Sequence, residues 1–340
     1  MRIMKAIGYV DSLPIEDERS LVEFETPTPV PGPHDLLVRI EAVSVNPVDT
    51  KVRMRRQGTA EAPVILGWDA AGTVAAVGAT VTLFRPGDAV YYAGDLTRPG
   101  TNAEYGLVDE RIAGRKPESL SFAQAAALPL TAITAWEALF DRFRLPVGKA
   151  PTDDAILIVG AAGGVGSIAV QLARRLTGLT VIGTASRPES QSWVAGLGAD
   201  AVIDHTKPLA AELARIGRPQ VRYILSLTHT DRHWDEIAAA LAPQGEICFI
   251  DDPEALDIMK IKGKAGAVHI EFMFARSMHR TPDMVQQHKL LTEVAGLVDA
   301  GLVKTTLGEV VGPITAANLR KAHALIENGR TVGKLVLAGF

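Results

Sequence analysis

The stretch Ala155-Ile-Leu-Ile-Val-Gly-Ala-Ala-Gly-Gly-Val-Gly-Ser167 decides the fold of this chain. Its first half, from Ile156 to Val159, is an unbroken aliphatic run, which is typical of a parallel strand buried on both faces. Glycines then interrupt the run, and beyond them apolar residues recur at helical spacing as far as Leu176. The stretch therefore predicts a strand, a tight glycine loop and a helix.

The glycines carry the first functional hypothesis. Ala161, Gly163 and Gly166 match the A-x-G-x-x-G form of the dinucleotide-binding motif. Without Cβ atoms, the loop allows backbone amides at the start of the helix to approach a pyrophosphate. An ordinary strand-to-helix turn would also be rich in glycine, but the strand-loop-helix setting favours a dinucleotide site. The residues expected to bind it here are Gly160, Ala161, Gly163, Gly164, Val165 and Gly166.

Strands and helices alternate regularly after this motif. We predict strands near 156–160, 180–185, 201–204, 221–227, 246–250 and 267–273, with helices in the first four gaps. This alternation is typical of a doubly wound parallel sheet, so the predicted fold class is α/β. A long helix is expected from Asp283 to Leu302.

Residues 1 to about 125 have a different character, with short alternating apolar segments separated by turn signals such as Phe84-Arg-Pro-Gly87. This pattern predicts a small, partly closed β-barrel. The last segment, from Leu307 to Leu337, is similar in character, and we expect it to complete the first domain. The predicted domains are therefore 1–125 with 304–340, and an inserted nucleotide-binding domain at 126–303.

Charge and cysteine content exclude several classes of function. The 340 residues carry a net charge of −4 with no run of Lys or Arg, which argues against nucleic acid or an anionic membrane as partner. The single cysteine, Cys248, lies in an apolar run and is predicted to be a buried strand residue rather than a nucleophile. With no disulfide, signal peptide or membrane-spanning run expected, the predicted location is cytoplasmic.

Several further motifs follow one another in a recognisable order. They are Ser44-Val-Asn-Pro-Val-Asp49, Asp69-Ala-Ala-Gly-Thr-Val74, Arg85-Pro-Gly-Asp-Ala-Val90, Leu128-Pro-Leu-Thr-Ala-Ile-Thr-Ala-Trp136, the glycine loop and Gly333-Lys-Leu-Val336. With them the chain resembles the medium-chain dehydrogenases/reductases, in their quinone oxidoreductase branch. The resemblance implies a GroES-like β-barrel catalytic domain plus a doubly wound Rossmann domain, with the active site in the cleft between them.

Zinc-containing members of that superfamily hold a catalytic zinc through Cys and His, and this sequence departs from them. Asn46 stands where a cysteine ligand would be, and Trp68 stands where the histidine would be. No four-cysteine lobe is present for a structural zinc, so we predict no bound metal. His229 and His233 have the spacing of metal ligands but no third ligand nearby in sequence. We therefore expect this segment to be a loop that leads into a helix.

Without a metal, the site depends on hydride transfer from the cofactor and on hydrogen bonds to the substrate oxygen. The resemblance places Asn46 and Thr131 near the nicotinamide and the substrate. Tyr92 and Asp49, in neighbouring loops, are weaker catalytic candidates. The alternatives are a turn or helix-capping role for Asp49 and a half-buried barrel aromatic for Tyr92.

The end of the second predicted strand favours NADPH over NADH. NAD-binding enzymes usually carry Asp or Glu there, but this chain has Ala185, Ser186 and Arg187. The Arg187 guanidinium can pair with a 2′-phosphate, and Ser186 adds a hydroxyl, although a solvated surface arginine remains the alternative. By resemblance, His205 would lie beside the adenosine.

The function predicted from these features is an NADPH-dependent oxidoreductase that transfers a hydride to quinones or to activated alkenes such as α,β-unsaturated carbonyls. A zinc-free alcohol or aldehyde reductase and a non-catalytic NADPH-binding sensor or structural protein are the alternatives. The resemblance also implies a homodimer that pairs through the apolar edge strand Ala267-Val-His-Ile-Glu-Phe-Met-Phe274.

Overall fold

The computed structural model describes residues 2–340, which divide into two compact units. Within these residues, the barrel unit consists of 2–133 and Phe274–Phe340, and the parallel-sheet unit of Thr134–Met273. Residues 274–303, expected in the nucleotide-binding domain, group here with the barrel unit. The assignment of functional domains stays a prediction, and each unit is described by itself below.

The parallel-sheet unit contains six parallel strands in the order β11-β10-β9-β12-β13-β14. This is the doubly wound Rossmann order, with the reversal of direction at β9, so the predicted fold class is confirmed. The strands are β9 (Ala155–Val159), β10 (Thr180–Thr184), β11 (Ala201–Ile203), β12 (Val221–Ser226), β13 (Leu241–Phe249) and β14 (Ala267–Ile270). The connections contain α4 (Gly164–Leu176), α5 (Pro188–Gly196), α6 (Leu209–Arg215), α7 (Thr230–Ala240) and the 3-10 segment η4 (Ile258–Lys264).

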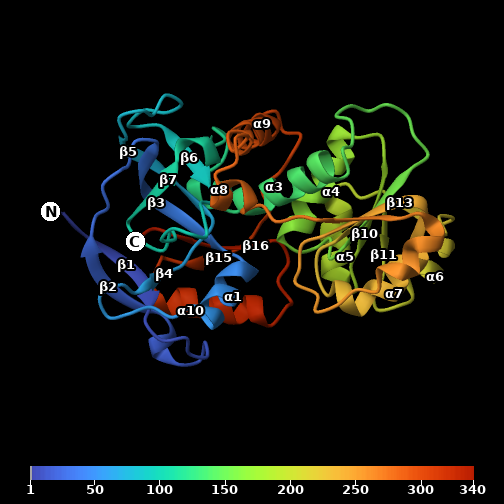
Figure 1. Ribbon diagram of the computed structural model, residues 1–340, viewed down its shortest axis with the longest axis horizontal. Helices are drawn as coiled ribbons and strands as arrows, with labels where there is room; N and C mark the ends of the chain where they lie inside the picture. The colour runs from blue at the N-terminus through green and yellow to red at the C-terminus, as the bar shows by residue number, and fades with distance from the viewer. Residues whose placement is uncertain (1) are drawn as a thin grey trace. The chain divides into compact units, whose positions relative to one another are not determined.

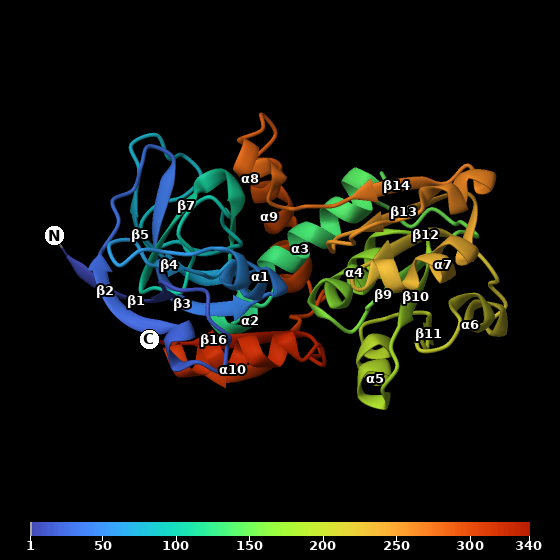
Figure 2. The ribbon, with the colours of Figure 1, turned by 60° about the horizontal axis from the view of Figure 1, so that its bottom comes forward.

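Helices cover both faces of this sheet (Figure 2) because alternate strand residues point to opposite sides. On one face, Leu157, Ile182 and Ile224 belong to a buried cluster that includes Trp234 and Ile237 of α7. On the other face, a Cβ atom at Gly183 would lie 2.5 Å from Val194 of α5. Both faces are therefore dry, which explains why the strands read as unbroken apolar runs.

The barrel unit contains a seven-stranded sheet in the order β15-β16-β3-β5-β6-β8, with β7 also paired to β3, and a three-stranded sheet β2-β1-β4 (Figure 1). The strands are β1 (Ile3–Tyr9), β2 (Val22–Pro27), β3 (Asp35–Val45), β4 (Val64–Ile65), β5 (Ala70–Val77), β6 (Ala89–Tyr92), β7 (Tyr105–Asp109), β8 (Ala113–Arg115), β15 (Leu307–Gly312) and β16 (Lys334–Ala338). The α-helices are α1 (Pro47–Arg55), α2 (Phe122–Ala126), α8 (Ala275–His279), α9 (Gln286–Asp299) and α10 (Ala316–Glu327), and the 3-10 turns are η1 (Glu18–Ser20) and η2 (Glu110–Ile112).

The C-terminal strand β16 lies antiparallel to the end of β3, with Leu335 opposite Val45. The Ser44 hydroxyl donates a hydrogen bond of 3.0 Å to the Leu335 carbonyl, which fixes the same register from the side chain. Segments nearly 300 residues apart in sequence (a separation of 291 for this bond) therefore meet at the point where β3 ends.

The helix α3 (Pro129–Trp136) follows α2 and continues into the π-helical turn η3 (Glu137–Arg142). The boundary between the two units falls inside α3, after Ile133. Across residues 2–340, the structure contains no helix that combines the length and the apolar character needed to cross a bilayer.

Candidate active site

The first part of the site forms where β3 ends and α1 begins. Asn46 has an extended backbone, as expected before a proline, and Pro47 occupies the first turn of α1, where its missing N–H costs nothing. The Asn46 amide donates to Asp49 Oδ2 at 2.7 Å, and the Asp49 amide donates to the Asn46 carbonyl at 2.9 Å. Asp49 therefore caps the helix, which was the alternative to its catalytic role.

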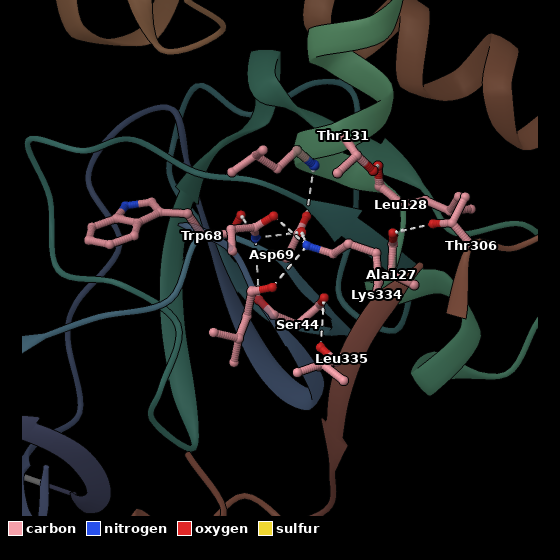
Figure 3. Close-up of polar contacts among 12 residues, drawn as sticks. Ser44, Trp68, Asp69, Ala127, Leu128, Thr131, Thr306, Lys334 and Leu335 are labelled. Carbon is pink, nitrogen blue, oxygen red and sulfur yellow. Dashed lines mark hydrogen bonds and ion pairs between the residues drawn. The ribbon is translucent and has the colours of Figure 1, made fainter. Parts of the chain in front are cut away.

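The Asn46 side chain belongs to a buried cluster with Asp69 and Lys334, which we call the Lys334 cluster. Figure 3 shows Asp69 and Lys334 directed toward each other. Asn46 Nδ2 donates to Asp69 Oδ2 at 2.8 Å. Lys334 Nζ donates to Asp69 Oδ2 at 3.0 Å, to the Val45 carbonyl at 3.2 Å and to Asn46 Oδ1. The exposed fractions are 1% for Asn46, 0% for Asp69 and 3% for Lys334, so water does not screen this ion pair.

The second carboxylate oxygen of Asp69 links the cluster to α3. Asp69 Oδ1 accepts a hydrogen bond of 2.7 Å from the Leu130 amide, in the first turn of α3. An anion at this end of a helix meets unsatisfied amides and the positive end of the helix dipole. Thr131, the next residue, is 2% exposed, and its hydroxyl donates to the Leu128 carbonyl at 3.0 Å. Asp69 thus connects Asn46 with the turn that carries Thr131.

Two carboxyl groups beside Lys334 have altered acidity. Burial raises the pKa of Asp49 to about 7, against the opposing effects of the Asn46 amide and the Lys334 ammonium. Burial also raises the pKa of Asp69, and the Lys334 ammonium again opposes the rise. Asp49 Oδ1 is buried without a hydrogen-bond partner, which agrees with burial as the main cause of the raised pKa of this carboxyl.

Tyr92, at the end of β6, lies inside the barrel unit, and its hydroxyl makes no hydrogen bond. It is 1% exposed, and its hydroxyl is buried without a partner, in a place where a Cβ atom at Gly106 would lie 3.0 Å away. Burial raises its pKa well above the usual value. The tyrosine is more deeply enclosed than the half-buried alternative suggested.

The residues at the positions of zinc ligands do not fit a zinc ion. Trp68 is 1% exposed, its indole N–H donates to the Asp95 carbonyl at 3.3 Å, and its ring meets Phe274 edge to face at 6.5 Å. An indole N–H is a donor only, and the Asn46 amide oxygen already accepts from an ammonium. Neither side chain can therefore replace the thiolate or the imidazole that the resemblance implies for zinc-containing members.

The two histidines with metal-like spacing lie at the start of α7. His229 precedes the helix with a left-handed backbone (φ 49°), and His233 lies in its first turns. Over the described residues 2–340, no group of three or more His, Cys, Asp or Glu side chains has an arrangement suited to a metal ion.

In the parallel-sheet unit, the glycine loop leads from β9 into α4 as predicted. Gly160 has a left-handed backbone (φ 82°), and a Cβ atom at Gly166 would lie 2.4 Å from the Gly160 carbonyl oxygen. The Ser167 amide is bonded to the Gly163 carbonyl, so the amides of residues 164–166 precede the first helical bond. This close-packed helix N-terminus fits the pyrophosphate of a dinucleotide.

The structure brings the end of β10 next to this loop. The Gly160 amide donates to Thr184 Oγ1 at 3.0 Å. Thr184 is followed closely by the half-buried Ser186 and by the exposed Arg187, which is the N-cap residue of α5. His205 follows β11 on the same edge of the sheet, where its half-buried ring meets that of His233 edge to face, with centroids 6.1 Å apart. The predicted cofactor residues of this unit thus share the carboxyl ends of neighbouring strands, whereas Thr131 lies on α3 in the barrel unit.

Another buried polar cluster lies in the same unit. Arg142 Nε donates to Glu271 Oε2 at 2.8 Å, and both Glu137 and Glu271 are almost completely buried. Burial, reinforced by Glu137, raises the pKa of Glu271 to about 8.

Cys248 is fully buried and unpaired in β13, as predicted, and burial raises the pKa of its thiol far above the usual range.

The sequence reasoning missed Asp69 and Lys334 as members of the site. Both lie in motifs quoted for the resemblance, but neither was assigned a role. The available signal was a charged residue beside an apolar strand: Asp69 precedes β5, and Lys334 begins the run Lys-Leu-Val-Leu-Ala of β16. A charge in such a place is rarely buried without a partner.

Comparisons with known proteins match two families. The alcohol dehydrogenase GroES-like domain matches residues 32–126, and the zinc-binding dehydrogenase family matches residues 197–337. A zinc-type alcohol dehydrogenase-like protein of Staphylococcus aureus (strain COL) is 41% identical over 336 residues, which cover 98% of this chain and 99% of the relative. The chloroplastic NADPH-dependent alkenal/one oxidoreductase of Arabidopsis thaliana is 37% identical over 211 residues, 59% of this chain and 50% of the relative.

Solved structures extend the similarity. One of them is a Rhizobium etli CFN 42 protein that is named for a proposed zinc-dependent alcohol dehydrogenase activity. It is 58% identical to this chain with a TM-score of 0.96, and the match covers 100% of this chain and 99% of the Rhizobium chain. The quinone oxidoreductase of Coxiella burnetii is 28% identical with a TM-score of 0.80 over the full length of both chains.

Proposed function

Because the chain belongs to the medium-chain dehydrogenase/reductase superfamily, a family of oxidoreductases, we propose that it reduces activated alkenes and quinones with NADPH and without catalytic zinc. In this proposal residues 126–303 bind the cofactor, and residues 1–125 with 304–340 form the catalytic domain. The protein is proposed to act in the cytoplasm on small molecules.

The Lys334 cluster is the observation that carries the proposal. At the two positions where zinc-containing members of the superfamily carry Cys and His, this chain has Asn46 and Trp68, and the Asn46 amide is bound to a buried ammonium and to a carboxylate. Carbonyl reduction of an unactivated substrate gains several kcal/mol from a Lewis acid, whereas an electron-poor alkene or quinone spreads the developing charge over its own conjugated system. The chemistry of the residues therefore favours activated acceptors.

Support for NADPH comes from the parallel-sheet unit. We propose that the loop Gly160, Ala161, Gly163, Gly164, Val165 and Gly166 holds the pyrophosphate, that Ser186 and Arg187 bind the 2′-phosphate, and that His205 lies beside the adenosine. NADPH supplies the hydride when bound. The exposed Arg187 side chain and the absence of a carboxylate between Thr184 and Arg187 are consistent with a 2′-phosphate.

Support for the substrate class comes from the relatives. The Arabidopsis relative is named for NADPH-dependent reduction of alkenals and alkenones, and the Coxiella structure for a quinone oxidoreductase. In our proposal Thr131 and Asn46 orient the nicotinamide and the substrate from the two sides of Asp69. Asp49, with its pKa near 7, and Tyr92 are the secondary catalytic candidates.

The test is consumption of NADPH followed at 340 nm (roughly the absorbance maximum of the reduced nicotinamide) with an enone, 9,10-phenanthrenequinone and a simple aldehyde. We expect turnover of the enone or the quinone and none of the aldehyde, in protein treated with a chelator and shown by elemental analysis to lack zinc. Asn46→Ala and Thr131→Ala should lower kcat/KM.

Three outcomes would contradict the proposal. Turnover of the aldehyde alone would indicate an alcohol or aldehyde reductase, and NADPH binding without turnover of any acceptor would indicate a sensor or structural protein. One tightly held zinc per active chain would reject the zinc-free site. Full activity of both Asn46→Ala and Thr131→Ala would show that the site is elsewhere.

A further inference from the structure

We infer that Lys334 is a positioning residue of the active site, whose buried ammonium holds Asn46 and Asp69 in the single arrangement that anchors α3 to the barrel. Lys334 lies at the start of the last strand, far in sequence from every group it binds. The inference deepens the proposed function, because it assigns the group that orders the residues expected to place substrate and nicotinamide.

The ammonium has no hydrogen left for solvent. An ammonium has three hydrogens, and Lys334 Nζ meets three acceptors: the Val45 carbonyl, Asn46 Oδ1 and Asp69 Oδ2. With 3% of the residue exposed, the charge is separated from water and compensated within the cluster. A lysine that served only solubility would keep its charged end in water.

The ammonium also decides which way the Asn46 amide points. Its oxygen faces Lys334 and its nitrogen faces the Asp69 carboxylate at 2.8 Å, so the reverse orientation would bring N–H groups against an ammonium and an oxygen against a carboxylate. Without Lys334 the amide oxygen loses its donor, and only the bonds of Nδ2 hold the orientation: the one to Asp69 at 2.8 Å and the longer contacts with the Ser44 and Trp68 carbonyls at 3.4 and 3.5 Å.

The same ammonium belongs to the set of donors around Asp69, whose carboxylate oxygens accept hydrogen bonds from Asn46, from Lys334 and from the Leu130 amide of α3. Asp69 is fully buried, and burial raises the pKa of its carboxyl while Lys334 lowers it. Loss of the ammonium would favour protonation of this carboxyl and weaken the charge-assisted bond to the Leu130 amide. The first turn of α3, with Thr131, would then lose its anionic cap.

If Lys334 had a purely structural role, a different result would be expected from a variant in which Lys334 and Asp69 are both replaced by neutral residues. Removing one member of a buried ion pair is strongly destabilising, whereas replacing both by neutral groups is often tolerated. Lys334→Met combined with Asp69→Asn keeps the volume and removes both charges. If Lys334 only stabilises the fold, this double variant should recover both stability and turnover. If Lys334 positions the site, the double variant should recover stability but not turnover.

The experiment compares the full-length wild type, Lys334→Met, Asp69→Asn and the double variant, with exposed Lys321→Met on α10 as control. We expect each single variant of the cluster to lower the melting temperature, and the double variant to recover at least half of that loss. In the double variant kcat with an enone or quinone should stay at least tenfold below wild type, with less than a threefold change in the KM for NADPH. Lys321→Met should match wild type.

A readout without turnover keeps this inference separate from the proposed function. Hydrogen exchange measured by mass spectrometry should show faster exchange in peptides covering the start of α3 in the double variant than in wild type, even if no substrate is found. Wild-type kcat and wild-type exchange at α3 in the double variant would overturn the positioning role. Unchanged melting temperature and exchange in Lys334→Met would show that the cluster does not depend on the ammonium.

Discussion

At the scale of single residues, His323 on α10 is a buried base without a partner. It is 0% exposed, neither ring nitrogen has a hydrogen-bond partner, and burial, with a smaller effect of Arg53, lowers its pKa to about 3. In the unfolded chain the His323 imidazole binds a proton near pH 6.5, whereas in the folded chain it does so only near pH 3. Between pH 6.5 and 3 the unfolded chain therefore binds more protons than the folded chain. The contribution to stability is therefore complete above pH 6.5 and is lost as the pH falls.

His323→Leu should remove that acid sensitivity. We expect wild type to lose up to about 1.4 kcal/mol of unfolding free energy per pH unit below pH 6.5 from this group alone, and the variant to lose less. Denaturant unfolding at pH 7.0 and 5.0 measures the difference, with exposed His279→Leu as the control. Equal pH dependence in wild type and His323→Leu would show that the imidazole is not kept neutral.

Arg187 is the residue that would distinguish the two nicotinamide cofactors. A charge-assisted contact of roughly 1.5–3 kcal/mol with a 2′-phosphate means that Arg187→Ala should weaken NADPH binding by about 10- to 150-fold and leave NADH nearly unchanged. Calorimetric titration with each reduced cofactor measures this, and exposed Arg215→Ala on α6 in the same unit provides a comparison. Equal losses for both cofactors, or a wild-type preference for NADH, would contradict the assignment.

At the scale of elements, the junction of β9 with α4 depends on one close backbone contact. A Cβ atom at Gly166 would lie 2.4 Å from the Gly160 carbonyl oxygen and 2.5 Å from the Ala161 Cα, both of which belong to rigid backbone. Gly166→Ala should therefore lower the unfolding free energy by about 1–3 kcal/mol and abolish tight NADPH binding, because α4 must move away from the loop.

Gly163→Ala is the matched control at the same junction. The nearest atom to an added Cβ there is the Gly160 carbonyl oxygen at 3.5 Å, an ordinary contact, and its φ of −73° suits alanine. We expect a change of only a few tenths of a kcal/mol in thermal or denaturant unfolding of the cofactor-free protein. Equal destabilisation by the two alanines would mean that backbone approach does not decide this junction.

At the scale of the whole molecule, β14 is an edge strand of the parallel sheet. Ile270 is 66% exposed and Phe272, just beyond the strand, is 47% exposed. An apolar edge with unpaired backbone groups invites pairing with another chain, and we predict a homodimer formed through β14. Light scattering should give twice the 36.2 kDa of one chain, and Ile270→Asp should shift the mass toward the monomer.

The control for this prediction is Val310→Asp on β15, which is 50% exposed at the edge of the other large sheet. It should leave the mass unchanged. A wild-type mass near 36.2 kDa at micromolar concentration would refute the dimer, and a dimer that survives Ile270→Asp but not Val310→Asp would place the interface on the barrel unit.

The glycine loop and the strands around it follow from the sequence because the information is local. Consecutive apolar residues, glycines and helical spacing lie within about 15 residues of one another, and the helical connections between them favour a parallel sheet. The predicted ends of several strands, such as 180–185 for β10 (Thr180–Thr184), agree closely with the structure, whereas β13 begins at Leu241 instead of 246 and β14 ends at Ile270 instead of 273. The edge position of β14 and the burial of Cys248 follow from the same local patterns.

The Lys334 cluster could not be predicted in this way. Lys334 and Asp69 are 265 residues apart, and Lys334 and Asn46 are 288 apart, so no spacing rule connects them. The antiparallel pairing of β16 with β3 brings these residues together, because it places Lys334 next to the end of β3. The site is buried, and a charge there is stable only beside a carboxylate. The sequence by itself determined the two kinds of sheet and the glycine loop, whereas tertiary structure alone decided which polar groups meet, because burial and distance depend on strand pairing.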